Sequence, residues 1–223
     1  MPDLYDNPVI LTHVRTKLAL HQLRDGPGRP LLLIHGLGDC SPSEVPSWAE
    51  QWPGGVHALD LTGHGRSSRP RGGGYTAEQL MADVDVALAR LGPCTIIGHG
   101  LGAYLALLIS GARPELVRGV ALCDGPGLAG GGPAPTSLVI VNPPDAPLTA
   151  DEPDPYALLE MSRDIRPPDY AGTYARQALA NSAAETPIVV CARWRPPWLE
   201  AVANEGGVIE STLTEAVALL ARQ

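Results

Sequence analysis

The chain has 223 residues, and 44% of them are hydrophobic, which is enough to build one sizeable core and excludes a disordered segment. A formal net charge of −8 argues against partners that present a phosphate backbone, so no nucleic acid is expected to bind. No run of about 18 apolar residues occurs, so no membrane association is expected. The early acidic residues do not match a secretion signal, which predicts a cytoplasmic protein.

The patterns up to residue 124 alternate between strands and helices. Apolar and polar residues alternate over 8–24 as in a β-hairpin, whereas PLLLIHG at 30–36 is a continuous apolar run typical of a strand buried on both faces. Thr76 and Gln79 have the spacing of a capping box and begin a segment with an apolar helical face. The same reasoning predicts further strands over 54–62, 94–99 and 116–124, and helices near 46–52, over 76–92 and over 100–113.

The second part of the chain begins with a different composition. Residues 125–155 are rich in Pro and Gly and show little periodicity, and residues 156–181 have the pattern of one or two short helices. Thr212 and Glu215 fit a second capping box. The remaining patterns predict strands over 186–194 and 208–211, and helices over 196–207 and 212–223.

This alternation predicts an α/β fold with a mostly parallel central sheet and helices on both faces. We expect a single domain in which residues 1–124 and 186–223 form the core and residues 125–185 form a small cap insertion. In such sheets ligands bind beside the carboxyl ends of the strands, so functional residues are expected in the loops that follow the strands.

Three short motifs follow three of the predicted strands. They are HG at 35–36, DLTGHGRS at 60–67 and GHGLG at 98–102, the last forming a sharp turn between a strand and a helix. In this order and spacing the motifs resemble the α/β-hydrolase fold family. The resemblance implies a nucleophile at the centre of the sharp turn, an acid after a later strand, and a His that comes last in the chain.

Carried over position by position, the resemblance supplies none of these three side chains. The nucleophile position falls on Gly100, and the acid position falls near Arg195. The His position falls on Gly207, or near Ser211 and Thr212. All six His residues of the chain stand at or before position 99. The resemblance therefore implies a degenerate member of the family that lacks the Ser-Asp-His triad.

Gly100 suits the turn even without a side chain. The central residue of such a turn has a positive φ, which costs a non-glycine residue about 1 kcal/mol or more and glycine much less. In the family, two backbone amides beside the nucleophile stabilise an oxyanion, and the resemblance assigns them here to Leu37 and Leu101. Both are candidate catalytic positions, because amides at a helix N-terminus polarise a carbonyl or bind a carboxylate.

Asp124 and His99 are the ionisable candidates for catalysis. Asp124 follows the strand after the sharp turn, where it could act in a pocket or cap the loop that begins with Gly125. His99 adjoins Gly100 and could act as an acid or a base. Its position in the family favours a packing role beneath the turn instead.

The expected pocket is lined by residues of the same loops. His35, Gly36 and Gly100 lie at the ends of two predicted strands, although His35 is also explained by a role in ordering its own loop. Trp194 and Trp198 flank the acid position. They could fill the space that a triad would occupy, or they could shape a flat apolar ligand site.

The four cysteines do not have the spacing of metal ligands, so neither a metal nor a cofactor is predicted. Three of them lie in apolar strand patterns, which favours structural thiols. Cys40, in a loop, is the candidate for reactivity.

Three functions stay open at this point. The first is a non-hydrolytic enzyme that uses the two amides for a cyclisation, elimination, isomerisation or pericyclic step on an apolar carbonyl-bearing metabolite, as in bacterial secondary metabolism. The second is an inactive pseudo-hydrolase that serves as a ligand receptor or an interaction scaffold. The third is a weak esterase whose water is activated by His99 or Asp124. The first is preferred narrowly, and it predicts a small apolar molecule as the partner.

Overall fold

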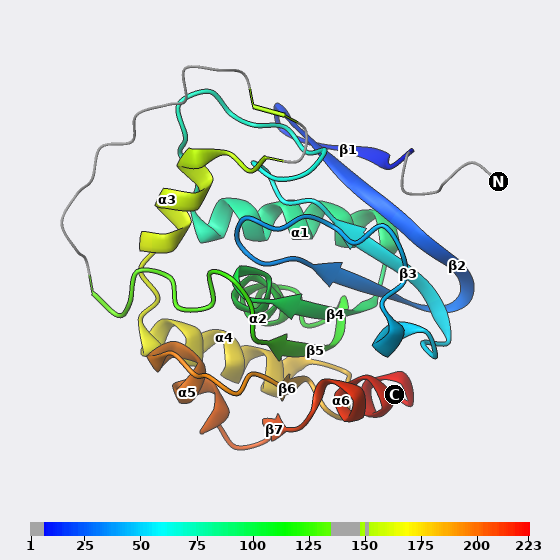
Figure 1. Cartoon of the computed structure of the whole chain (residues 1–223). Helices are drawn as coiled ribbons and strands as arrows, with labels where there is room; N and C mark the ends of the chain where they lie inside the picture. Colours follow the sequence, from blue (N-terminus) through cyan, green and yellow to red (C-terminus); the bar gives the residue numbers. More distant parts are fainter. Residues whose placement is uncertain (1–6, 135–147, 150–151) are drawn as a thin grey trace.

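The structure is a computed structural model that describes residues 7–134, 148–149 and 152–223. Its centre is a seven-stranded sheet in the order β1-β2-β4-β5-β6-β7, with β3 paired to β2 (Figure 1). The β1–β2 pair is antiparallel, and the pairs from β2 to β7 run parallel. The strands are β1 (Val9–His13), β2 (Thr16–Ile34), β3 (Gly54–Leu59), β4 (Cys94–His99), β5 (Val117–Cys123), β6 (Ile188–Val190) and β7 (Ile209–Glu210).

The element β2 is longer than either of the strands predicted for its sequence. It also includes the residues between the predicted segments 8–24 and 30–36, around Gly26 and Gly28, where the chain bends around the start of β3. Its early residue Leu20 pairs with Leu59, and its last residue Ile34 pairs with Leu59 as well. A Cβ on Gly28 would lie 3.1 Å from the backbone of Gly54, so this close approach of two strands favours glycine.

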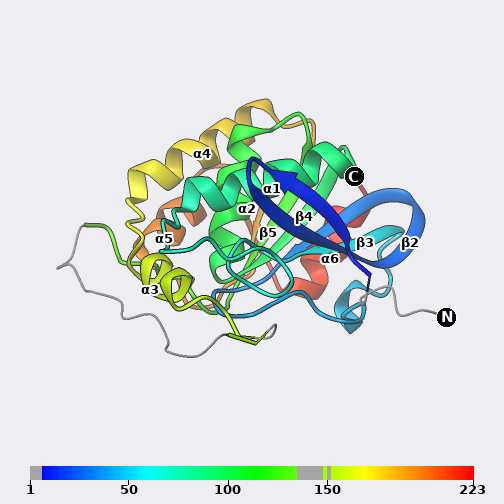
Figure 2. The same ribbon diagram turned by 90° about the horizontal axis from the view of Figure 1, so that it is seen from above.

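Helices cover both faces of the sheet (Figure 2). One face carries α1 (Ala77–Leu91), α2 (Leu101–Ala112), α4 (Pro168–Asn181) and α5 (Pro197–Ala203). The other carries α6 (Leu213–Ala221) and the short 3₁₀ helix Ser47–Ala49, which is all that forms of the helix predicted near 46–52. Helix α3 (Pro155–Arg163) lies beyond the carboxyl ends of the strands, on the side to which the arrowheads of β4 and β5 point in Figure 1. The predicted α/β fold with a mostly parallel sheet is confirmed.

Side chains of the strands alternate between the two faces. Leu32 and Ile34 pack under α1 and α2, whereas Leu31 and Leu33 pack on the side of α6. Both sets are buried, and this explains why the central strands have continuous apolar sequences. Both predicted capping positions have the expected contact at the start of α1 and α6. Only Thr212 and Glu215 make the reciprocal box.

The predicted cap insertion over 125–185 is covered only in part, since residues 135–147 and 150–151 lie outside the described residues. Within it, α3 and α4 are buried against the same core as α2, through Met161 and Ala175 among others. The division into core and cap stays a prediction. In the described part of the chain, no helix has the length and hydropathy that crossing a membrane requires.

Candidate functional site

The sharp turn between β4 and α2 is built from three glycines. Gly100 has φ 58° and ψ −117°, outside the conformations that L side chains prefer. A Cβ on Gly98 would lie 2.2 Å from the carbonyl oxygen of Gly102, and a Cβ on Gly102 would lie 2.4 Å from that of Ile34. The glycines thus let the first turn of α2 lie directly against β4 and β2.

The backbone amides of Leu37 and Leu101 converge on one atom, and that atom belongs to the chain itself. Each N–H donates to the carbonyl oxygen of Pro126, and both N···O distances are 2.9 Å. Leu101 is the first residue of α2, so the carbonyl dipole of Pro126 also faces the positive end of that helix. The two amides therefore form a cradle for a carbonyl oxygen, and Pro126 occupies it.

The same carbonyl excludes a side chain at residue 100. A Cβ on Gly100 would lie 2.0 Å from the Pro126 oxygen, far inside van der Waals contact. Gly125 adds to the crowding, because a Cβ there would lie 2.7 Å from the amide nitrogen of Gly100. Backbone from the loop after β5 thus fills the space above the turn.

Two buried side chains hold this loop, which we define as the plug loop, residues 125–128. The guanidinium of Arg166 donates to the carbonyl oxygens of Gly127 at 2.6 Å and Leu128 at 2.8 Å, and it lies 4.4 Å from the ring centroid of Tyr104. The indole N–H of Trp198 also donates to Leu128, at 2.8 Å. Arg166 is 1% exposed, and burial lowers the pKa of its guanidinium.

Arg166 was missed by the sequence reasoning. It follows a short helical pattern and precedes a proline, and neither feature distinguishes it from the scattered surface arginines of this chain. The two tryptophans named from the sequence also separate in space. Trp198 is buried against Tyr104, with ring centroids 5.0 Å apart, whereas Trp194 is 58% exposed.

His35 and His64 are held as neutral rings that organise the loop carrying Leu37. In His35, Nδ1 donates to the carbonyl of Gly36 at 2.7 Å, and Nε2 accepts from the amide of Leu61 at 3.1 Å. In His64, Nδ1 donates to Thr62 at 3.2 Å, and Nε2 accepts from Gly38 at 3.1 Å. Because Nε2 accepts an amide proton in both rings, neither can take up a proton without losing that contact.

Asp124 and His99 do not form an acid–base pair. The carboxylate of Asp124 accepts from the backbone amides of Arg193 at 2.8 Å and Trp194 at 3.2 Å, so it joins the loop after β5 to the loop after β6. The Nδ1 of His99 donates instead to the backbone carbonyl of Asp124, at 3.3 Å. Burial lowers the pKa of His99, which keeps the ring neutral at pH 7.

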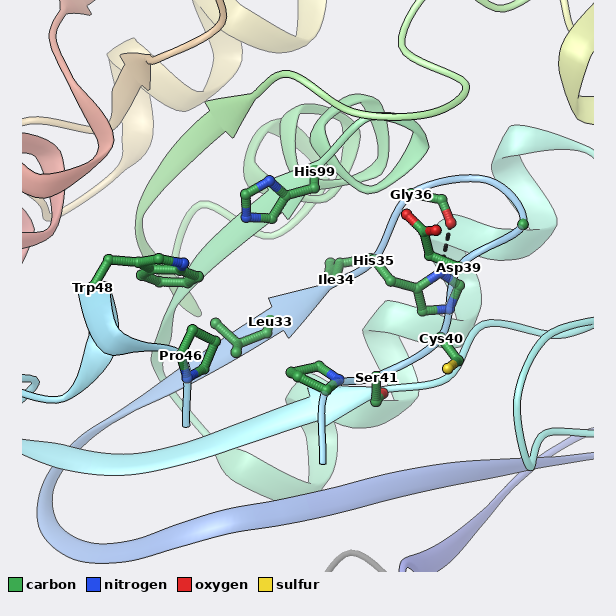
Figure 3. Close-up of a pocket in the computed structure, with 12 residues that line it drawn as sticks. Leu33, Ile34, His35, Gly36, Asp39, Cys40, Ser41, Pro46, Trp48 and His99 are labelled. Atoms are coloured by element: carbon green, nitrogen blue, oxygen red, sulfur yellow. Dashed lines mark hydrogen bonds between the residues drawn. The ribbon is translucent and has the colours of Figure 1, made fainter. Parts of the chain in front are cut away.

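The ring of His99 lines a pocket of about 570 Å³ (Figure 3). The pocket lies between the ends of β2 and β4 and the loop that leads to the 3₁₀ helix. The ring centroids of His99 and Trp48 are 5.9 Å apart across it. Polar groups are few and include His35 and Asp39. The lining is completed by Leu33, Ile34, Gly36, Gly38, Cys40, Ser41, Pro42 and Pro46. Of the predicted pocket residues, His35 and Gly36 lie here with His99, whereas Gly100, Trp194 and Trp198 do not line it.

Residues 31–213 match the sequence profile of the alpha/beta hydrolase family. The chain belongs to this family. One similar protein is the (E)-2-((N-methylformamido)methylene)succinate hydrolase of Acinetobacter baylyi, which is 33% identical over 47% of this chain and 41% of its own length. Another is the 2-hydroxymuconate semialdehyde hydrolase of Pseudomonas putida, 34% identical over 47% of this chain and 39% of its own length. The matches thus span less than half of these curated relatives.

Solved structures share the fold over nearly the whole chain. The thioesterase domain from the curacin biosynthetic pathway superposes with a TM-score of 0.68 and covers 97% of both chains at 17% identity. A hypothetical protein of Pseudomonas aeruginosa PAO1 gives a TM-score of 0.62 with 97% coverage of both chains, again at 17% identity. At this level of identity the likeness concerns the α/β-hydrolase fold alone.

In this α/β hydrolase the ends of the last two strands carry an ion pair. Arg195, in the loop after β6, donates to both carboxylate oxygens of Glu210 at 3.0 and 2.5 Å. Since β7 ends at Glu210, the position after the last strand is Ser211 and not Gly207. Thr212 caps helix α6. In the described part of the chain, no group of three or more His, Cys, Asp or Glu residues has a metal-binding arrangement.

Proposed function

We propose that this α/β-hydrolase-fold chain does not catalyse acyl transfer, and that it acts by binding a small molecule in the pocket beside Trp48 and His99. The observation that carries the proposal is the position of the Pro126 carbonyl, which accepts from the amides of Leu37 and Leu101 while standing against Gly100. An oxyanion hole works only if its donors are available to the substrate. Here both donors are engaged by the carbonyl oxygen of Pro126.

The residues at the three triad positions support the loss of hydrolysis. Gly100 has no nucleophilic side chain, Arg195 is paired with Glu210, and Ser211 follows the last strand. No His occurs in this chain after position 99. His35 and His64 do not supply a replacement base, because their ring protons and lone pairs are committed to loop contacts.

The other two functions fit the geometry less well. A non-hydrolytic enzyme that polarises a carbonyl needs the Leu37 and Leu101 amides vacant, which would require the plug loop to leave its contacts with Arg166 and Trp198. A weak esterase needs a base above the turn. The carboxylate of Asp124 is instead engaged by two backbone amides in the next loop.

The pocket chemistry points to a class of ligand. The Nδ1–H of His99 donates to the backbone carbonyl of Asp124, so its Nε2 is an acceptor. The carboxylate of Asp39 is a second acceptor in the lining. Trp48, Leu33 and the prolines provide an apolar wall. We infer an apolar, aromatic ligand that carries a neutral hydroxyl donor, and discrimination against carboxylates.

A matched pair of probes tests this function. 4-Ethylphenol should raise the melting temperature of the protein, whereas 4-ethylbenzoate at the same concentration should not, because a ligand that binds only the native state stabilises it. The shift should disappear in Trp48→Ala and persist in Trp194→Ala, which removes an exposed tryptophan outside the pocket.

Hydrolysis is measured in parallel with 4-nitrophenyl butyrate. The expected rate is that of buffer alone, for the native protein and for His99→Ala. Turnover that exceeds the buffer rate and is lost in His99→Ala would refute the absence of catalysis. Equal stabilisation by the phenol and the benzoate, or a phenol shift that persists in Trp48→Ala, would refute the ligand site.

A further inference from the structure

Two cysteines that are far apart in the sequence meet at the carboxyl ends of neighbouring strands. Cys123 is the last residue of β5, and Cys191 directly follows β6. The preceding residues, Leu122 and Val190, are paired in the parallel register. The amide of Cys191 also donates to the carbonyl of Leu122 at 2.8 Å, which keeps the two chains together beyond the last strand pair.

Both side chains point to the same face of the sheet. Cys123 and Cys191 pack with the cluster under α6, as expected from the two-residue period that places Ala121 and Val189 on that face. The two thiols are close enough for each to shift the pKa of the other. In-register neighbours on adjacent strands have a Cα separation within the range that a disulfide spans.

The two thiols differ in their access to solvent. Cys123 is 4% exposed, whereas Cys191 is only partly buried. Cys191 lines a second pocket, of about 550 Å³, together with Arg195, Glu210 and Thr212. A small reagent can therefore reach Cys191 but not its partner.

Contact between the two thiols also separates their pKa values. It raises the pKa of the Cys123 thiol, which keeps its proton, and burial acts in the same direction. The same contact lowers the pKa of Cys191, since the thiolate is the form that accepts the proton of its neighbour. The accessible sulfur is thus also the better nucleophile.

We propose that Cys123 and Cys191 are a redox-active dithiol, in which Cys191 reacts first with a hydroperoxide and Cys123 then closes a reversible disulfide. This proposal does not depend on the ligand proposed for the other pocket, since neither cysteine lines that pocket.

The reaction balances with a hydroperoxide as the oxidant. The Cys191 thiolate attacks the terminal oxygen, so an S–O bond forms, the O–O bond breaks, and the leaving oxygen takes a proton to give an alcohol, or water from hydrogen peroxide. The sulfur of Cys123 then attacks the sulfur of Cys191. The S–S bond forms, the S–O bond breaks, and the Cys123 proton leaves with the hydroxide as water. A dithiol reductant reverses the oxidation by thiol–disulfide exchange.

Peptide mapping tests the pairing directly, because each of the four cysteines falls on a different tryptic peptide. The full chain is treated with hydrogen peroxide, its remaining thiols are alkylated, and the digest is analysed without reduction. The expected product is the linked Cys123–Cys191 peptide pair, with the loss of two hydrogen atoms and full recovery after dithiothreitol. The oxidised chain should melt at a higher temperature than the reduced one, since the bond restricts the unfolded state.

Single variants test the order of events. In Cys123→Ser, Cys191 should accumulate as a sulfenic acid that dimedone captures. In Cys191→Ser, Cys123 should stay reduced and reactive only after unfolding. Cys94→Ser, which removes a fully buried thiol on β4, should pair Cys123 with Cys191 as the native chain does. Full alkylation of both thiols after peroxide, a linkage through Cys40 or Cys94, or dimedone on Cys123 would overturn the proposal.

Discussion

The carbonyl oxygen of Pro126 lies 2.9 Å from the amide nitrogen of Leu101, at the N-terminus of α2. This single contact changes what the turn around Gly100 can do. A helix N-terminus with two converging amides is well suited to hold an oxyanion, but here it stabilises the loop after β5. The two amides thus contribute to the stability of the fold through their hydrogen bonds to Pro126.

Gly100→Ser is expected to destabilise the protein and to create no esterase activity. The new Cβ would stand 2.0 Å from the Pro126 oxygen, in a backbone conformation with φ 58°. We expect a loss of about 3 kcal/mol in the free energy of unfolding, from overpacking and backbone strain together. Urea unfolding and a 4-nitrophenyl butyrate assay measure both effects.

Gly72→Ser is the matched control for this variant. Gly72 also has a positive φ, of 85°, but a Cβ there meets nothing within 4 Å. It should therefore cost only the conformational part, about 1 kcal/mol. Similar losses in the two variants would contradict the crowding by Pro126.

Arg166→Met is expected to release the plug loop. The substitution keeps a long side chain at this position but removes the guanidinium that lies over the Tyr104 ring and donates to the carbonyls of Gly127 and Leu128. The Gly127 carbonyl would lose its Arg166 donor, whereas the Leu128 carbonyl would keep Trp198, and we expect the free energy of unfolding to fall by about 3 kcal/mol. Hydrogen exchange at the Leu37 and Leu101 amides should also become faster, because both depend on Pro126.

Arg176→Met serves as the comparison, since it breaks an ion pair with Glu205 at the surface. That loss should stay within about 1 kcal/mol, with no change in the exchange of the two amides. Unchanged exchange in Arg166→Met would mean that Trp198 and the packing alone hold the loop.

Acidification is expected to destabilise the protein through His64. Burial lowers the pKa of this ring to about 3, whereas an unfolded His has a pKa of about 6.5. Between these values the unfolded chain binds the proton and the native chain does not, so the stabilisation present above pH 6.5 is lost as the pH falls toward 3. Urea unfolding at pH 7.5 and pH 5 should show the decrease, and His64→Gln should make it smaller. An equally steep decrease in that variant would assign it to other groups.

Asp60→Asn is expected to loosen the loop that lines the pocket. The carboxylate is fully buried and accepts from His21 at 2.9 Å and from the amides of Ser41 and Arg66 at 2.8 Å. Burial alone would raise the pKa of Asp60, but these hydrogen bonds outweigh it and hold the pKa below its usual range. An amide cannot accept all three, so we expect a loss of about 2 kcal/mol in unfolding experiments. Asp85→Asn, at an exposed pair with Arg113, should change little.

Much of the architecture could be predicted from local sequence. Strand β4 (Cys94–His99) coincides with its predicted range, and β5 differs from its own by one residue at each end. Continuous apolar runs and caps such as Thr212 are readable because the contacts that they encode are local or depend on a simple period. The joining of two predicted strands into β2 could not be predicted from local sequence, because the bend in β2 forms only around the start of β3.

The sequence by itself determined that the turn would carry glycine and that this chain has no His after position 99. What fills the amide cradle, which arginine holds the plug loop, and which cysteines are neighbours were decided by the tertiary structure. Pro126 stands 25 residues after Leu101, and Cys191 stands 68 residues after Cys123. Contacts across such separations follow from the order and register of the strands, which no local pattern records.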